Sequence, residues 1–172
     1  HPHPAQGRRQ GHLGPVMGGW APYLAAWAVF LSSHTIPVRP RVKRWLVARL
    51  GPVGFGLLYG AVSVLALAWL IVAAGRAPWV PLWDAAPWQR SAAQGATLAA
   101  CLLIALAVLL PNPLSFGGAR NDRFDPARPG IAGLVRHPFL AALALWSAGH
   151  VPANCDLAHA LMFAGFAAFA VL

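Results

Sequence analysis

The chain has 172 residues, of which 58% are hydrophobic and 10% are charged. A soluble domain carries about 25% charged residues, so this composition argues against a water-soluble protein and for a membrane protein. The formal net charge of +9 would suit a nucleic-acid binder, but the placement of the charges decides against that partner.

The N-terminal segment and the first apolar stretch differ sharply in composition. Residues 1–16 are rich in proline, glycine, histidine and arginine, and we interpret them as a disordered or non-native tail that precedes Met17. Residues 17–37 form the first expected span, with aromatic side chains spaced 3, 4, 3 and 4 residues apart up to a histidine. They are Trp20, Tyr23, Trp27, Phe30 and His34. This spacing places the side chains on one helical face, which could contact a porphyrin or a polyene. The same face is equally typical of a stripe that packs against another helix or faces lipid.

A basic segment and a second apolar stretch follow. The sequence VRPRVKRWLVARLGP (38–52) predicts an interfacial helix, with its cations toward lipid headgroups. Residues 51–75 carry no charge and are long enough to cross a bilayer, which takes roughly 20 residues. The next loop, 76–90, interleaves tryptophans with prolines, which predicts an irregular cap at the membrane interface or, less simply, a lid over a ligand cavity.

Three further spans complete the expected architecture. Residues 92–110 form the third, and residues 111–136 form a polar, turn-rich loop whose carboxylates Asp122 and Asp125 have arginines nearby for local ion pairs. Residues 137–151 form a short fourth span, and residues 157–172 form a fifth that stops at the chain end. The prediction is an all-α, polytopic integral membrane bundle of about five transmembrane helices (17–172), with a C-terminus that is expected to continue.

The loops alternate in positive charge. Two of them hold most of the cations: Arg39, Arg41, Lys43, Arg44 and Arg49 in 38–50, and Arg120, Arg123, Arg128 and Arg136 in 111–136. The positive-inside rule therefore places loops 38–50 and 111–136 in the cytoplasm. The excess charge is explained by topology, so membrane lipids are the expected partners and nucleic acid is not.

Two histidines bracket the fourth span. Pro138 suits the first helical turn, which puts His137 at the entrance of the helix and His150 at its other end. Thirteen residues correspond to roughly 20 Å and about 140° of rotation, so these two imidazoles cannot bind one iron. His137 shares its face with small residues, whereas His150 shares its face with Phe139, Leu143 and Trp146. The nearby Asp156 is expected either to cap the fifth helix or to orient His150.

Other chemistry-bearing motifs are missing from the sequence. Cys101 and Cys155 are isolated, with no CxxC zinc spacing and no CxxCH for covalent haem, so any haem would be non-covalent. The sequence also has no paired carboxylates in its spans, no Gly-rich phosphate loop and no nucleophile elbow. These absences argue against hydrolase and kinase chemistry.

Several motifs in the same order resemble the NnrU family of bacterial membrane proteins. They are FLSSHTIP (30–37), LYGAVSVLAL (58–67), APWVPLW (77–83), LLPNPLSFGG (109–118) and RHPFLAALALWSAGHVPANCDLAHALMF (136–163). The family includes the 15-cis-zeta-carotene isomerase, a haem b enzyme. The resemblance implies a multi-pass protein of the bacterial inner membrane that binds haem b through His34 and His150 and isomerises a polyene. The alternative is a non-catalytic accessory that supports nitrite and nitric oxide reduction in denitrification.

Two features leave these implications open. The cysteine that serves the isomerase as an alternative ligand falls on Ser147 here, which puts the isomerase activity in question. The charge pattern also places His34 level with His137, whereas the resemblance and the helical face favour His34 with His150. We favour the second pair and keep His137 as the other candidate. A structural membrane protein whose histidines are merely hydrogen-bonded is a third interpretation.

Overall fold

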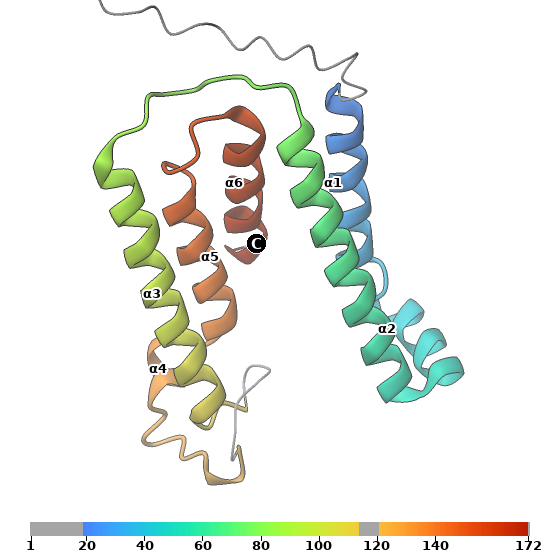
Figure 1. Ribbon diagram of the computed structural model, residues 1–172. Helices are drawn as coiled ribbons and strands as arrows, with labels where there is room; N and C mark the ends of the chain where they lie inside the picture. Colours follow the sequence, from blue (N-terminus) through green and yellow to red (C-terminus); the bar gives the residue numbers. More distant parts are fainter. Residues whose placement is uncertain (1–18, 114–120, 172) are drawn as a thin grey trace, which may run out of the picture. The chain divides into compact units, whose positions relative to one another are not determined.

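A computed structural model describes residues 19–113 and 121–171, and within these ranges the protein is helical with no strand. The helices are α1 (Trp20–Thr35), α2 (Pro40–Arg76), α3 (Pro87–Leu109), α4 (Ile131–Leu134), α5 (Pro138–His150) and α6 (Leu157–Val171), with a single 3-10 turn at Asn121–Arg123 (Figure 1). The all-α prediction is confirmed. The predicted tail, 1–16, lies outside the described residues.

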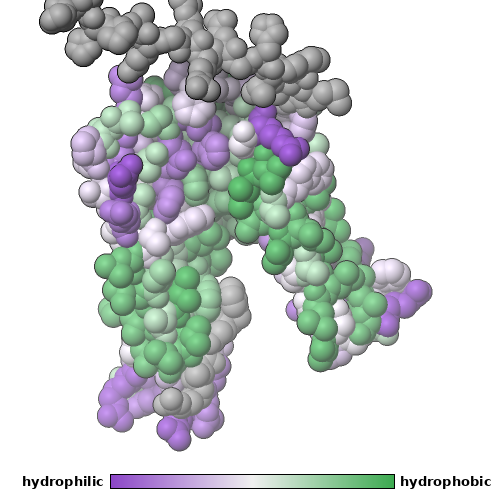
Figure 2. All heavy atoms as spheres, viewed as in Figure 1, coloured by the Kyte–Doolittle hydropathy of each residue, from purple (hydrophilic) through white to green (hydrophobic). Residues whose placement is uncertain are grey.

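Two of the described helices, α2 and α3, are long and apolar enough to cross a membrane, with 37 and 23 residues. Helices α1, α5 and α6 have 16, 13 and 15 residues, which is short of the roughly 20 that a bilayer crossing takes. Hydrophobic residues cover the middle of α2 and α3, while hydrophilic residues gather toward the ends (Figure 2). The expectation of a membrane protein is therefore supported, and that of five spans is confirmed in part.

The chain divides into two compact units, one up to Pro78 and one from Trp79 onward. In the first unit α1 packs along α2 and buries Tyr23, Ala26 and Phe30. In the second unit α5 is the central helix, because it packs against α3 on one side and α6 on the other (Figure 1).

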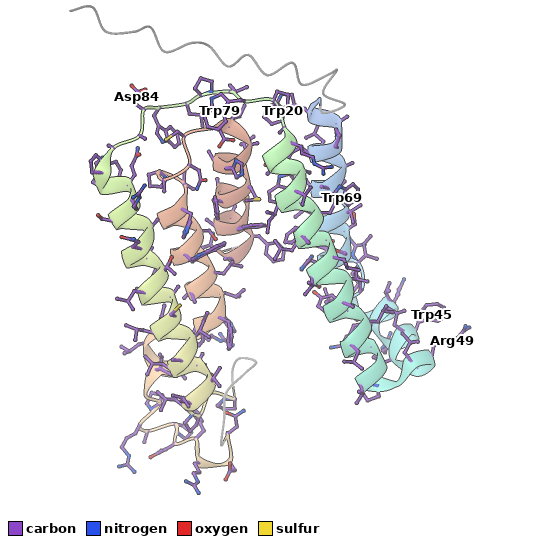
Figure 3. All side chains as sticks on the ribbon, in the orientation of Figure 1. Trp20, Trp45, Arg49, Trp69, Trp79 and Asp84 are labelled. Carbon is purple, nitrogen blue, oxygen red and sulfur yellow. The ribbon has the colours of Figure 1, made fainter. Side chains whose placement is uncertain are left out.

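Helix α2 contains a sharp break at Gly51, which adopts φ 71° and ψ 166°. The break separates the basic segment 40–50 from the long apolar shaft, so the predicted interfacial helix is a distinct element. Trp45 and Arg49 project from this short segment (Figure 3), with the Arg49 guanidinium 4.9 Å from the centre of the Trp45 ring. Pro52 reinforces the break, because a residue that precedes proline avoids the helical conformation.

We expect Gly51→Ala to destabilise the protein by about 1–3 kcal/mol, because only glycine adopts these backbone angles without strain. Thermal unfolding in detergent, followed by circular dichroism, measures the effect. Gly60→Ala in the same helix is the matched control, since a side chain there meets no atom within 4 Å. Equal stabilities of the two variants would contradict the expectation.

Residues 79–86, which we call the Trp loop, run without helix between α2 and α3. Pro81 pairs with Asp156 in an isolated antiparallel bridge. The Leu82 N–H donates to the Cys155 carbonyl at 2.8 Å, the Leu157 N–H donates to the Val80 carbonyl at 2.9 Å, and the Trp83 indole donates to the Pro152 carbonyl at 2.9 Å. These bonds tie the Trp loop to the α5–α6 connection, in agreement with the predicted irregular cap. Trp79 and Asp84 mark the loop in Figure 3.

The opposite end of the second unit is held by one buried amide. The Asn112 N–H donates to the side-chain oxygen of Asn121 at 2.8 Å, and the Asn112 side chain donates to the Arg136 carbonyl at 3.3 Å. Asp125 forms the predicted local ion pair with Arg128 at 3.1 Å. Because the Arg128 side chain is 88% exposed, that pair adds little stability.

Candidate functional site: two oriented imidazoles and a groove

His34 and His150 have the same local arrangement. Each lies at the C-terminal end of its helix, and its Nδ1 faces a carbonyl one turn earlier: Phe30 at 2.7 Å for His34, and Trp146 at 2.8 Å for His150. A carbonyl only accepts hydrogen bonds, so each Nδ1 carries the proton and donates it. In a neutral imidazole this leaves Nε2 unprotonated, which is the form that binds a metal.

The aromatic face predicted on α1 is present. Consecutive rings from Trp20 to Phe30 lie 5.7, 6.5 and 5.8 Å apart, and the Phe30 and His34 rings lie 4.2 Å apart. The His34 ring also lies 6.1 Å from the Tyr59 ring of α2. The face is thus a continuous aromatic strip that ends at an oriented imidazole.

His150 is surrounded by aromatic rings from two helices. Its ring lies 4.8 Å from that of Trp146 and stacks on that of Phe163 in α6 at 5.0 Å. The neighbouring Ser147 is fully buried, and its hydroxyl donates to the Leu143 carbonyl. The predicted aromatic environment of His150 is therefore present, and the Ser147 hydroxyl is used within the helix.

His150 also lines a groove of about 890 Å³ between the N-terminal half of α3, the end of the Trp loop and the α5–α6 connection. Among the residues that the structure describes, the Nε2 of His150 has no hydrogen-bond partner. His150 therefore lines the groove with its Nδ1 bonded to the Trp146 carbonyl and its Nε2 without a partner among the described residues.

Sequence reasoning missed this groove, although a signal for it exists. Arg90, Gln94, Thr97 and Cys101 all line it, at spacings of 4, 3 and 4 residues along α3. That is the same kind of spacing as in the aromatic strip of α1. A polar strip of this period in an apolar helix indicates a face turned toward protein or a cavity.

His137 and His150 lie at opposite ends of α5. His137 precedes Pro138 as an exposed N-cap of α5, at the other end of the helix from His150. The helix is continuous between them, so roughly 20 Å separates the two imidazoles and they cannot bind one iron. His34 belongs to the first unit.

Asp156 and Asn154 have structural roles around the α5–α6 connection. Asp156 caps α6 by accepting the His159 N–H at 3.2 Å, and its carboxylate oxygens lie 2.9 Å from the Nδ1 of His159. The predicted cap is therefore confirmed. The Asn154 side chain donates to the main-chain carbonyl of His150 at 2.7 Å. It therefore supplies a hydrogen bond to a carbonyl at the C-terminal end of α5 and does not orient the imidazole.

The fold and the site define a helical protein with membrane-spanning character and two similarly oriented imidazoles. The family described as "NnrU protein" matches residues 23–172. The chain therefore belongs to the NnrU family. No curated protein and no solved structure matches it.

Proposed function

We propose that this NnrU-family protein binds haem b non-covalently through His34 and His150 in the bacterial inner membrane. In this proposal it acts as a redox-type isomerase of a lipid-soluble polyene resembling 15-cis-zeta-carotene. The observation that carries the proposal is the shared arrangement of the two imidazoles, each with Nδ1 donated to a carbonyl one helical turn earlier. This orientation is typical of metal-ligating histidines.

The donor set fits a haem. Within the described part of the chain, no three or more His, Cys, Asp or Glu side chains cluster to hold a bare metal ion, and the candidate donors come one at a time. A porphyrin coordinates iron through its own four nitrogens, so the protein needs to supply only one or two axial ligands. The aromatic rings beside each imidazole suit a flat, apolar macrocycle.

The residues of the chain would divide the remaining work. The aromatic strip of α1 and the Trp146–Phe163 pair would exclude water from the site. When bound, reduced haem supplies an iron centre that can weaken a double bond of a polyene enough for rotation. We further propose that α1, α5 and α6 complete a five-span bundle, with loops 38–50 and 111–136 in the cytoplasm.

A second function is favoured by Ser147. The related isomerase uses a cysteine as an alternative ligand at this position, whereas Ser147 offers no thiol and its hydroxyl is bonded to Leu143. A haem-carrying accessory without catalysis, supporting nitrite or nitric oxide reduction, would not need that ligand. In that case a deletion strain should lose reductase activity while its carotenoids stay unchanged.

The visible spectrum of the purified protein, supplied with haem b, tests the proposal. We expect a Soret band and the low-spin spectrum that two axial imidazoles produce. No Soret band after haem is supplied would contradict haem binding. Expression in a carotenoid-producing strain that lacks its own isomerase then separates the two functions: a changed isomer profile supports the isomerase, and an unchanged profile supports the accessory role.

A further inference from the structure

Arg90 stands out on the wall of the groove beside His150. Its guanidinium makes no hydrogen bond, ion pair or ring contact with any residue that the structure describes. The adjacent Gln89 is by contrast fully used: its Oε1 accepts the Ala86 N–H at 2.8 Å, and its Nε2 donates to the Asp84 carbonyl at 3.3 Å. Gln89 thus holds the start of α3 while Arg90 is available to a ligand.

The charge of Arg90 restricts what the groove would hold. A guanidinium stays protonated in proteins and offers five donors in a fixed fork that matches a carboxylate. The rest of the groove wall combines apolar residues, such as Ala93, Leu98 and Ala153, with the uncharged polar side chains of Gln94 and Thr97. A single arginine on the groove wall is complementary to a ligand that has an uncharged body and an acidic edge.

The position of Arg90 relative to His150 fits one such ligand. Gly149, next to His150, lies against Ala92, Ala93 and Ala96 of α3. Arg90 is therefore about one helical turn, roughly 6 Å of rise, closer to the Trp loop than the level of His150. A long arginine side chain covers such a separation.

We propose that Arg90 binds the propionate carboxylates of the haem whose iron His150 holds, which orients the carboxylate edge toward the Trp loop. This inference rests on the proposed haem binding and makes Arg90 a positioning residue. In this proposal Arg90 contributes to haem affinity through the carboxylates, and its replacement leaves the axial ligands in place.

A comparison of two ligands on two proteins tests this role. Haem b and its dimethyl ester, in which both carboxylates are capped, are titrated into wild-type protein and into Arg90→Gln while the Soret band is followed. We expect wild-type protein to bind haem b about 10- to 100-fold more tightly than the ester, as charge-assisted hydrogen bonds would give. Arg90→Gln should lose that preference, with the wild-type axial-ligand spectrum. The ester's greater partitioning into detergent affects both proteins alike, so the double difference cancels it.

Two control variants accompany this titration. Arg76→Gln, which removes a cation outside the groove, should keep the wild-type preference, and Arg90→Lys should keep part of it. If Arg90→Gln keeps the full preference, or wild-type protein shows none, Arg90 does not bind the carboxylates and haem binding stands. If neither ligand yields a Soret band with wild-type protein, the proposed haem binding fails, and the role of Arg90 fails with it.

Discussion

Replacing His150 with alanine is expected to lower the affinity for haem b more than about 100-fold. Partners that merely orient a metal ligand are worth 10- to 100-fold, so the ligand itself should contribute more. The side chain of His150 makes one hydrogen bond, to the Trp146 carbonyl, and it lies at the last position of α5. The helix should therefore fold without it. Titration of wild-type and variant protein with haem b, followed at the Soret band, measures the loss.

The controls separate a lost ligand from a damaged fold. Imidazole added to His150→Ala should restore the low-spin spectrum, which a misfolded protein would not permit. His137→Ala, at the other end of the same helix, should behave as wild type, and His34→Ala should lose the signature of two imidazoles. A wild-type spectrum for His150→Ala together with a lost spectrum for His137→Ala would instead assign the site to His34 with His137.

Gly149→Ala is expected to destabilise the protein by about 1–3 kcal/mol, the usual cost of overpacking a close contact. A Cβ at this position would collide with the Cβ of Ala96, and it would lie 3.4 Å from the Ala92 carbonyl oxygen. Neither atom belongs to a flexible side chain, so α3 and α5 would have to move apart. Thermal or SDS-induced unfolding in detergent measures the change.

Two further variants test whether the loss of stability comes from the contact between α3 and α5. Gly95→Ala makes the same chemical change on α3, where a Cβ meets no atom within 4 Å, and it should be neutral or stabilise by up to about 1 kcal/mol. Ala96→Gly combined with Gly149→Ala removes the collision, so the two changes should show a favourable coupling. The absence of coupling would mean that α3 and α5 do not approach at Gly149.

Most helices follow from hydrophobic length and from proline and glycine punctuation. Pro138 and Pro152 bracket α5, and the sequence Gly51-Pro52 marks the break that isolates the basic segment. Helix α3 begins at Pro87, five residues before the expected span that starts at 92, because Arg90 belongs to the helix and not to the loop. The bridge between Pro81 and Asp156 was not predicted, since backbone pairing between distant segments leaves no periodic trace.

The candidate site was predictable where it lies on one helical face. The aromatic strip that ends at His34 follows from spacing alone, and the aromatic setting of His150 follows in part from Trp146. The contribution of Phe163 required the packing of α6 on α5. The close approach at Gly149 likewise depends on which face of α5 meets α3, and small residues occur all around α5.

The shortest hydrogen bonds that orient His34 and His150, at 2.7 and 2.8 Å, end on the main-chain carbonyls of Phe30 and Trp146, and the Ser33 hydroxyl lies 3.2 Å from the Nδ1 of His34 in addition. No substitution at Phe30 or Trp146 deletes those acceptors, as long as the helix is preserved. Substitutions at residues 30 and 146 would therefore leave the proton of each imidazole on Nδ1. Relatives could replace both aromatic residues and keep the same donor geometry, so the exchange of an aromatic neighbour need not signal a lost site.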